Sequence, residues 1–238
     1  MTSIEHDNDT GLADFLAGWD KRLRENEQLP MWMAVLVLTN FGEQPVPSAR
    51  LAEVLARPVS EAEARAQGHC TTATPAEDGL TRVEDGLITF INSERTQSAP
   101  RRVLQIGDRR FGMTGCAPDV FLYAPLVRPS LHVEETCPAT GTPIRVVFTP
   151  SRVEHVEPSG AVVPILPPRE FDRLKGMSPK EADARMCAQC PFYSSADAAQ
   201  EWLAAHPGGR VFPVREAWDL SFHREWRDRM SALLKLDT

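Results

Sequence analysis

The chain has 238 residues, of which 42% are hydrophobic and 25% are charged, a composition typical of a globular protein of one or two domains. Its formal net charge of -7 argues against nonspecific binding to nucleic acid, which requires Lys and Arg to neutralise phosphates. The most apolar run, residues 31–38, is far shorter than the roughly 20 residues that cross a bilayer, and the acidic start lacks the pattern of a secretory signal. We therefore expect a cytoplasmic protein without a membrane partner.

The first part of the chain has the patterns of several helices followed by a hairpin. Apolar residues recur at helical spacing within 11–26, a second apolar helix is expected at 31–40, and two short helices are expected within 45–68. Asp85-Gly86 then separates two short β-prone runs, a pattern typical of a hairpin turn. This order of helices and hairpin is the layout of a winged helix.

A polar segment at residues 92–101 separates this part from the rest, and we place a domain boundary between residues 98 and 99. The second part is richer in strands, which we expect within residues 102–114, 131–150 and 160–168. Helices are expected from Ser178, over 194–209 and over 213–234. The predicted fold class is α+β: an N-terminal helical, winged-helix-like domain over residues 1–98, followed over residues 99–238 by a mixed or antiparallel β-sheet domain with packed helices.

Five cysteines carry the most specific chemical signal in the chain. In a cytoplasmic protein thiols stay mostly reduced, so these residues suggest metal binding or reactivity rather than a disulfide framework. They are Cys70, Cys116, Cys137, Cys187 and Cys190.

Cys116 stands three residues before Asp119, with a proline between them. Because Pro is favoured at the first position of a helix, Cys116 is expected at or just before an N-cap, where backbone N–H groups favour a thiolate. Residues at this spacing share a helix face, so the carboxyl can lie beside the sulfur. A thiolate with a neighbouring proton carrier is one hypothesis; a buried cysteine with a helix-start aspartate is the other.

Cys187 and Cys190 form a C-x-x-C pair, which is a half-site for zinc or for redox chemistry. A second such pair is absent from the sequence, although Cys116 and Cys137 could complete a four-cysteine zinc site. A zinc-stabilised or metal-carrying protein is therefore an open alternative.

Four segments, in order and spacing, resemble the bacterial organomercurial (alkylmercury) lyases. They are "RRFGMTGCAPDVFLYAPLV" (109–127), "CPATGTPIRVVFTPSRVEHVEPSGAVV" (137–163), "MCAQCPFYSSADAAQEWLAAHPG" (186–208) and "VREAW" (214–218). The resemblance implies an enzyme of mercury detoxification that cleaves the carbon–mercury bond by protonolysis, and it makes residues 99–238 an alkylmercury-lyase-like catalytic domain.

Carried over by motif, the family's catalytic residues fall on Cys116, Asp119 and Cys187, and Cys137 matches a cysteine that looks structural. The resemblance implies that Cys116, Cys187 and Asp119 hold the Hg(II) product, with Cys190 as a further candidate ligand. Two soft thiolates suffice for Hg(II), where zinc would require four ligands. Which of Cys187 and Cys190 faces Cys116 stays open.

The same resemblance implies no cofactor, with Hg(II) present only as bound product. The implied partners are a small organomercurial substrate, low-molecular-weight thiols that remove the ion, and mercuric reductase as its acceptor. The alternative is a homologue without lyase activity, acting as a thiol metal-binding protein or as a metal-responsive winged-helix regulator. The expected helices within residues 45–68 carry too few basic residues to favour nucleic acid as a partner.

Overall fold

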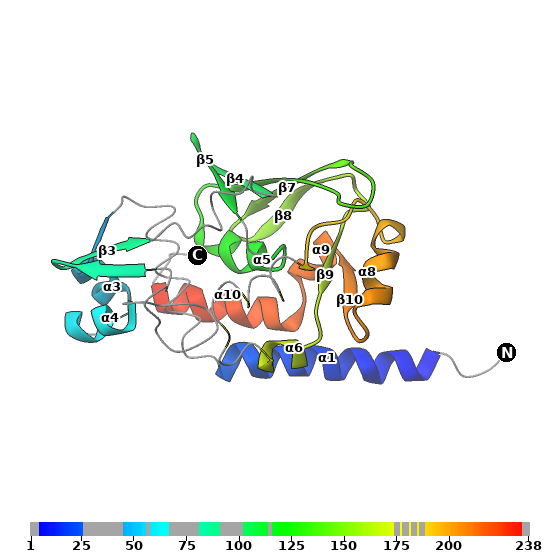
Figure 1. Ribbon diagram of the computed structural model, residues 1–238, viewed down its shortest axis with the longest axis horizontal. Helices are drawn as coiled ribbons and strands as arrows, with labels where there is room; N and C mark the ends of the chain where they lie inside the picture. The colour runs from blue at the N-terminus through cyan, green and yellow to red at the C-terminus, as the bar shows by residue number, and fades with distance from the viewer. Residues whose placement is uncertain are drawn as a thin grey trace.

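The computed structural model of the protein describes residues 5–25, 45–55, 58–66, 81–90, 102–113, 116–173, 177, 181, 185 and 189–234. Helices and antiparallel sheet are combined in one chain, as the α+β prediction expected (Figure 1). None of the described helices has both the length and the apolar character needed to cross a bilayer.

A five-stranded sheet forms the centre of the second part of the chain. Its spatial order is β5-β4-β6-β7-β8, with each neighbouring pair antiparallel. The predicted strand pairs at 102–114 and 131–150 are confirmed. The strand bounds are β4 (Arg102–Ile106), β5 (Arg109–Met113), β6 (Leu131–Thr136), β7 (Pro143–Thr149) and β8 (Arg152–Glu157).

A second, two-stranded sheet pairs β9 (Val162–Ile165) with β10 (Arg210–Pro213). The β-prone run at 160–168 predicted β9. Neither β8 nor β10 was predicted, because β8 is rich in charged residues and β10 is only four residues long and ends in proline. Antiparallel pairing with a neighbour, rather than local propensity, determines such strands.

Helices cover one face of the five-stranded sheet in two layers (Figure 1). The short helix α5 lies against α10, and α10 in turn lies against the long helix α1. The bounds are α1 (Glu5–Glu25), α5 (Asp119–Tyr123) continued by η3 (Ala124–Leu126), α6 (Arg169–Asp172), η5 (Asp197–Ala199) with α8 (Gln200–Ala205), α9 (Val214–Trp218) and α10 (Ser221–Leu234).

The N-terminal part contains α3 (Ser48–Leu55), α4 (Val59–Ala66) and a small sheet of order β1-β3-β2. Its strands are β1 (Val46–Pro47), β2 (Thr81–Glu84) and β3 (Leu87–Phe90). The hairpin predicted at Asp85-Gly86 is confirmed: both residues have positive φ, 51° and 74°, which a tight two-residue turn requires. The helix expected at 31–40, the boundary at 98/99 and the helix start at Ser178 lie outside the described residues.

The helix α1 joins the core of the second part of the chain. The Phe15 ring packs on Phe212 with centroids 6.1 Å apart, and the Trp19 ring packs on Phe222 at 5.9 Å. The Trp19 indole N–H also donates to the Leu166 carbonyl at 3.0 Å. The start of the chain is therefore tied to β9 and α10.

Phe121 of α5 is fully buried at the centre of the core. Its ring meets Phe148 of β7 edge-on at 5.3 Å and stacks on His223 of α10 at 4.9 Å. These contacts hold α5, and with it the turn that precedes it, between the sheet and α10.

We predict that Phe121→Ala lowers the free energy of unfolding by about 3–5 kcal/mol, because the buried ring leaves a cavity. Urea unfolding measures this change. The control is Val59→Ala, whose side chain is exposed and whose substitution should cost about 0.5 kcal/mol or less. Equal losses in the two variants would contradict the central position assigned to Phe121.

Candidate functional site

The turn that precedes α5 carries Cys116 and Asp119. Pro118 is the N-cap residue of α5 rather than its first helical residue, so Cys116 lies two residues before the cap, slightly farther from the helix than the sequence predicted. The Cys116 N–H donates to Oδ2 of Asp119 at 3.0 Å, and the Asp119 N–H donates to the Cys116 carbonyl at 3.1 Å. The carboxylate therefore reaches back to the cysteine, and this reciprocal pair closes the turn.

Cys116 is only 5% exposed, so its thiol lies at the boundary of the core rather than on the surface. The helix that follows has five residues, too short for its dipole to dominate the local field. The Asp119 carboxylate is held by the turn itself, where it accepts the hydrogen bond from the Cys116 amide.

The segment Cys190–Tyr193 lies against this turn. The Ala117 N–H donates to the Cys190 carbonyl at 2.7 Å, and Cys190 is buried. At its other end the segment is bridged to β9, since Tyr193 and Val162 exchange two backbone hydrogen bonds of 3.0 and 2.9 Å. The backbone of Cys190 thus meets the turn that carries Cys116 and Asp119, although more than seventy residues separate the two cysteines in the sequence.

Cys187 and Cys70 lie outside the described residues. Whether Cys187 or Cys190 faces Cys116 therefore stays a prediction from the sequence. The three described cysteines, at 116, 137 and 190, are all buried. Among the residues that the structure describes, no three His, Cys, Asp or Glu side chains gather as a metal-binding group.

Cys137 is buried at the end of β6 and is surrounded by hydroxyl groups. The Ser194 hydroxyl donates to the Cys137 Sγ at 3.5 Å, and the Thr140 and Ser194 hydroxyls lie 3.1 Å apart. Burial raises the pKa of the Cys137 thiol, but hydrogen bonds from Ser194 and Thr140 lower it by more, so the pKa falls from 9.0 to about 7. From the sequence, Cys137 was interpreted as a structural cysteine or as a member of a four-cysteine zinc site, and its hydroxyl neighbours were not predicted.

A buried ion pair, which sequence reasoning missed, lies beside the Cys190 segment. Nε of Arg102 on β4 and Oε2 of Glu135 on β6 are 2.9 Å apart. The signal that could have found it is the alternation of β6, where Glu135 shares the buried face with Leu131 and Val133.

Three histidines among the described residues have ordinary structural surroundings. His132 and His155 are exposed on β6 and β8. Complete burial lowers the pKa of His223 to about 4, although its hydrogen bond to the Ala217 carbonyl raises it and the charge of Arg227 lowers it further. His223 is therefore a neutral core residue beneath α5.

Comparison with known proteins gives a consistent result. The family model described as alkylmercury lyase matches residues 99–226. An alkylmercury lyase of Staphylococcus epidermidis is 29% identical over 214 residues, which cover 89% of this chain and 90% of that protein. One of Streptomyces lividans is 35% identical over 125 residues, covering 52% of each chain. The crystal structure of the mercury-bound form of MerB2 matches with a TM-score of 0.52 at 18% identity, covering 92% of this chain and 100% of that one, a likeness of fold.

We predict that Cys137 stabilises the protein increasingly as the pH rises from about 7 to 9.0, the folded and reference pKa values of its thiol. Between these two values the Cys137 thiol is ionised in the folded protein and still protonated in the unfolded chain. The free energy of unfolding therefore rises with pH in this window, and the stabilisation is lost as the pH falls through the folded pKa. Relative to Cys137→Ala, the free energy of unfolding should grow by roughly 2 kcal/mol across the window. Urea unfolding at several pH values measures the difference.

The matched control is Ser194→Ala, which removes one donor to the sulfur and should reduce the pH dependence without removing the thiol. Parallel pH profiles for the parent protein and Cys137→Ala would show that Cys137 is not a thiolate at neutral pH.

Proposed function

The chain belongs to the alkylmercury lyase family, and from that premise we propose that it is an organomercurial lyase that cleaves the carbon–mercury bond of R–Hg⁺ by protonolysis. The observation that carries the proposal is the meeting of the Cys116 turn with the Cys190 segment through the Ala117 hydrogen bond. This backbone contact brings two distant cysteine-bearing segments together, and one thiol from each would suit a soft, two-coordinate metal ion.

We assign the chemistry to Cys116, Asp119 and Cys187. The hydrogen bond between the Cys116 amide and the Asp119 carboxylate supports the first two, because it holds a proton acceptor beside a buried cysteine. Cys187 is assigned on the family motif and on its place three residues before Cys190. Cys190 is the alternative second thiol and a further candidate ligand for the product.

Capture comes first in the proposed reaction. One cysteine thiolate binds the mercury of R–Hg⁺, displacing the low-molecular-weight thiol that delivered it. The second cysteine then approaches the same mercury, and its thiol proton passes to the Asp119 carboxylate as the sulfur–mercury bond forms. Donation from two sulfurs raises the electron density on the carbon bonded to mercury.

Cleavage follows when the protonated Asp119 delivers that proton to the carbon, a general acid–base role. The carbon keeps the electron pair of the breaking mercury–carbon bond, so a hydrocarbon leaves and Hg(II) stays on the two sulfurs, with Asp119 as an additional ligand. Mercury remains Hg(II) throughout, so the step requires no oxidant, reductant or organic cofactor. External thiols, or mercuric reductase as acceptor, would then remove the ion in the cytoplasm.

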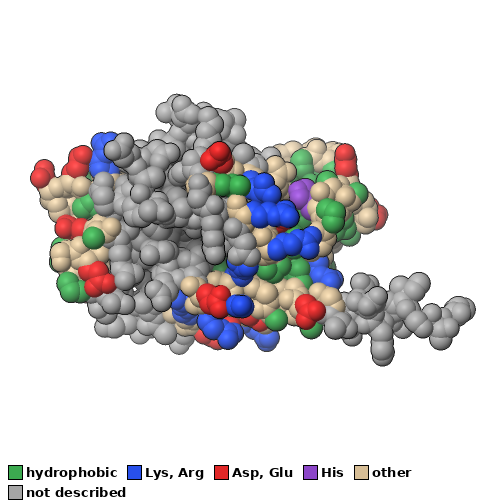
Figure 2. Space-filling model, turned by 60° about the horizontal axis from the view of Figure 1, so that its bottom comes forward, with side chains coloured by type: hydrophobic (Ala, Val, Ile, Leu, Met, Phe, Trp, Pro, Cys, Tyr) green, Lys and Arg blue, Asp and Glu red, His purple; other side chains and the backbone are tan. Residues whose placement is uncertain are grey.

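For the N-terminal part we propose a winged-helix-like packing domain over residues 1–98, ahead of a catalytic domain over residues 99–238. The pair of helices α3 and α4 with the three-stranded sheet supports this arrangement. A DNA-binding role is not favoured, because acidic residues Glu53, Glu61 and Glu63 are interspersed along these helices. Figure 2 shows acidic side chains over this end of the molecule.

The test is hydrocarbon release from phenylmercury in the presence of excess thiol, followed as benzene. We predict that the parent protein releases benzene and that Cys116→Ser and Cys187→Ser abolish release, because each removes one sulfur from mercury. Asp119→Asn should slow release by about 10²- to 10⁴-fold, the usual range for loss of a general acid–base.

Cys190→Ser is the matched control, since it keeps the backbone carbonyl that contacts Ala117 and removes only the thiol. Release that survives in Cys190→Ser and fails in Cys187→Ser supports the assignment. The opposite pattern makes Cys190 the second catalytic thiol. A parent protein that binds mercury and releases no benzene contradicts the lyase function.

A further inference from the structure

We propose that the buried ion pair between Arg102 and Glu135 positions the Cys190–Tyr193 segment against the Cys116 turn, and so sets how the second cysteine-bearing segment meets the first. Both residues would be positioning residues, because neither is placed in contact with the reacting atoms. The inference rests on the proposed lyase function and extends it to residues outside the family's cysteine and aspartate motifs.

The pair is built across two neighbouring strands. Arg102 of β4 lies opposite Glu135 of β6 in the strand register. The Arg102 Nε and Nη2 atoms lie 2.9 and 2.8 Å from the same oxygen, Oε2 of Glu135. The side chains are 2% and 0% exposed, so solvent does not screen their interaction.

Both partners also contact the segment that follows Cys190. The Phe192 N–H donates to Oε2 of Glu135 at 3.4 Å. The Arg102 guanidinium lies 5.4 Å from the centre of the Phe192 ring, within the range of a cation–π contact. Phe192 is thus held at its backbone and at its ring, two residues after the carbonyl that accepts the Ala117 hydrogen bond.

Stability alone does not account for this arrangement. Replacing a buried ion pair by apolar residues of similar size is often neutral or stabilising, because desolvation of the charges offsets their attraction. Here the pair is also incompletely satisfied: Oε1 of Glu135 is buried without a hydrogen-bond partner among the described residues. The pair instead orients the Cys190–Tyr193 segment. Oε2 of Glu135 can accept the hydrogen bond from the Phe192 N–H only when the segment lies in this one position.

That placement matters for the chemistry. The Cys190–Tyr193 segment is fixed by Ala117 of the Cys116 turn, by Val162 of β9 and by the ion pair. Two sulfurs can share one mercury ion only at a limited separation, and a misplacement of about 1 Å can slow a reaction by about 100-fold. Removing the ion pair releases one of these attachments while leaving every thiol in the chain.

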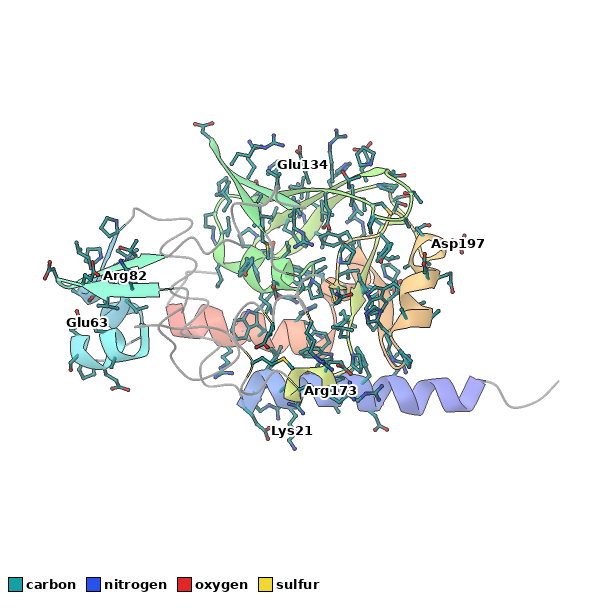
Figure 3. The ribbon with its side chains drawn as sticks, in the orientation of Figure 1. Lys21, Glu63, Arg82, Glu134, Arg173 and Asp197 are labelled. Atoms are coloured by element: carbon teal, nitrogen blue, oxygen red, sulfur yellow. The ribbon has the colours of Figure 1, made fainter. Side chains whose placement is uncertain are left out.

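The test uses the double variant Arg102→Met/Glu135→Leu, which removes the pair without leaving an unpaired buried charge. The control is Glu134→Gln. Glu134 is adjacent on β6 but pairs with Arg110 in an exposed ion pair, and Figure 3 shows it at the outer face of the sheet. Three quantities are measured in each protein: kcat and KM for benzene release, the thiol concentration that removes half of the bound Hg(II), and the hydrogen-exchange rate of the Ala117 amide.

We expect the double variant to lose at least tenfold in kcat with KM little changed, to release Hg(II) at a thiol concentration at least tenfold lower, and to exchange the Ala117 amide faster. Its thermal unfolding should remain close to that of the parent, and Glu134→Gln should match the parent throughout. A loss of stability alone would not produce this combination, because it lowers the folded fraction without changing the mercury affinity of the folded protein.

Parent-like kcat, Hg(II) retention and Ala117 exchange in a folded double variant would overturn the positioning role. If the double variant does not fold, Arg102→Lys keeps the charge and loses the guanidinium fork, and parent-like values there would overturn the role equally. If the parent itself releases no benzene, the lyase function fails, while Hg(II) retention and amide exchange still decide the positioning role.

Discussion

The hydrogen bond from the Ala117 amide to the Cys190 carbonyl joins the two cysteine-bearing segments of the site. One segment is the turn before α5, closed by the reciprocal contacts of Cys116 and Asp119. The other runs from Cys190 to the bridge between Tyr193 and Val162 of β9. Ala117 and Cys190 are far apart in the chain, so this hydrogen bond forms only because the rest of the fold brings the two segments together.

The hydrophobic core holds the Cys116 turn in its position. Phe121 packs α5 between the sheet and α10, and Trp19 ties the N-terminal helix to the same layer. The site is consequently built at the boundary of a rigid core, with its described thiols almost out of water. A dry site suits thiolate capture of a soft ion, because the attacking groups are positioned before the substrate arrives.

The sequence predicted the local features of this protein well. Alternation and turn residues located the hairpin at Asp85-Gly86 and the central strands, and the Cys116/Asp119 spacing led to a pair that the structure places in direct contact. The features it missed depend on distant partners. The Arg102–Glu135 pair and the hydroxyls around Cys137 each join positions far apart in the chain, and no local pattern encodes which strand lies opposite which.

The central claim is that one mercury ion is held by sulfurs from both segments. X-ray absorption spectroscopy of the purified Hg(II) complex, with free thiol removed, counts the sulfur ligands directly. The account predicts two sulfurs in the parent protein and in Cys137→Ser, and one protein sulfur in the double variant Cys116→Ser/Cys190→Ser, in which the C-x-x-C pair cannot supply both ligands. A two-sulfur site that persists in this double variant would place mercury elsewhere and contradict the account.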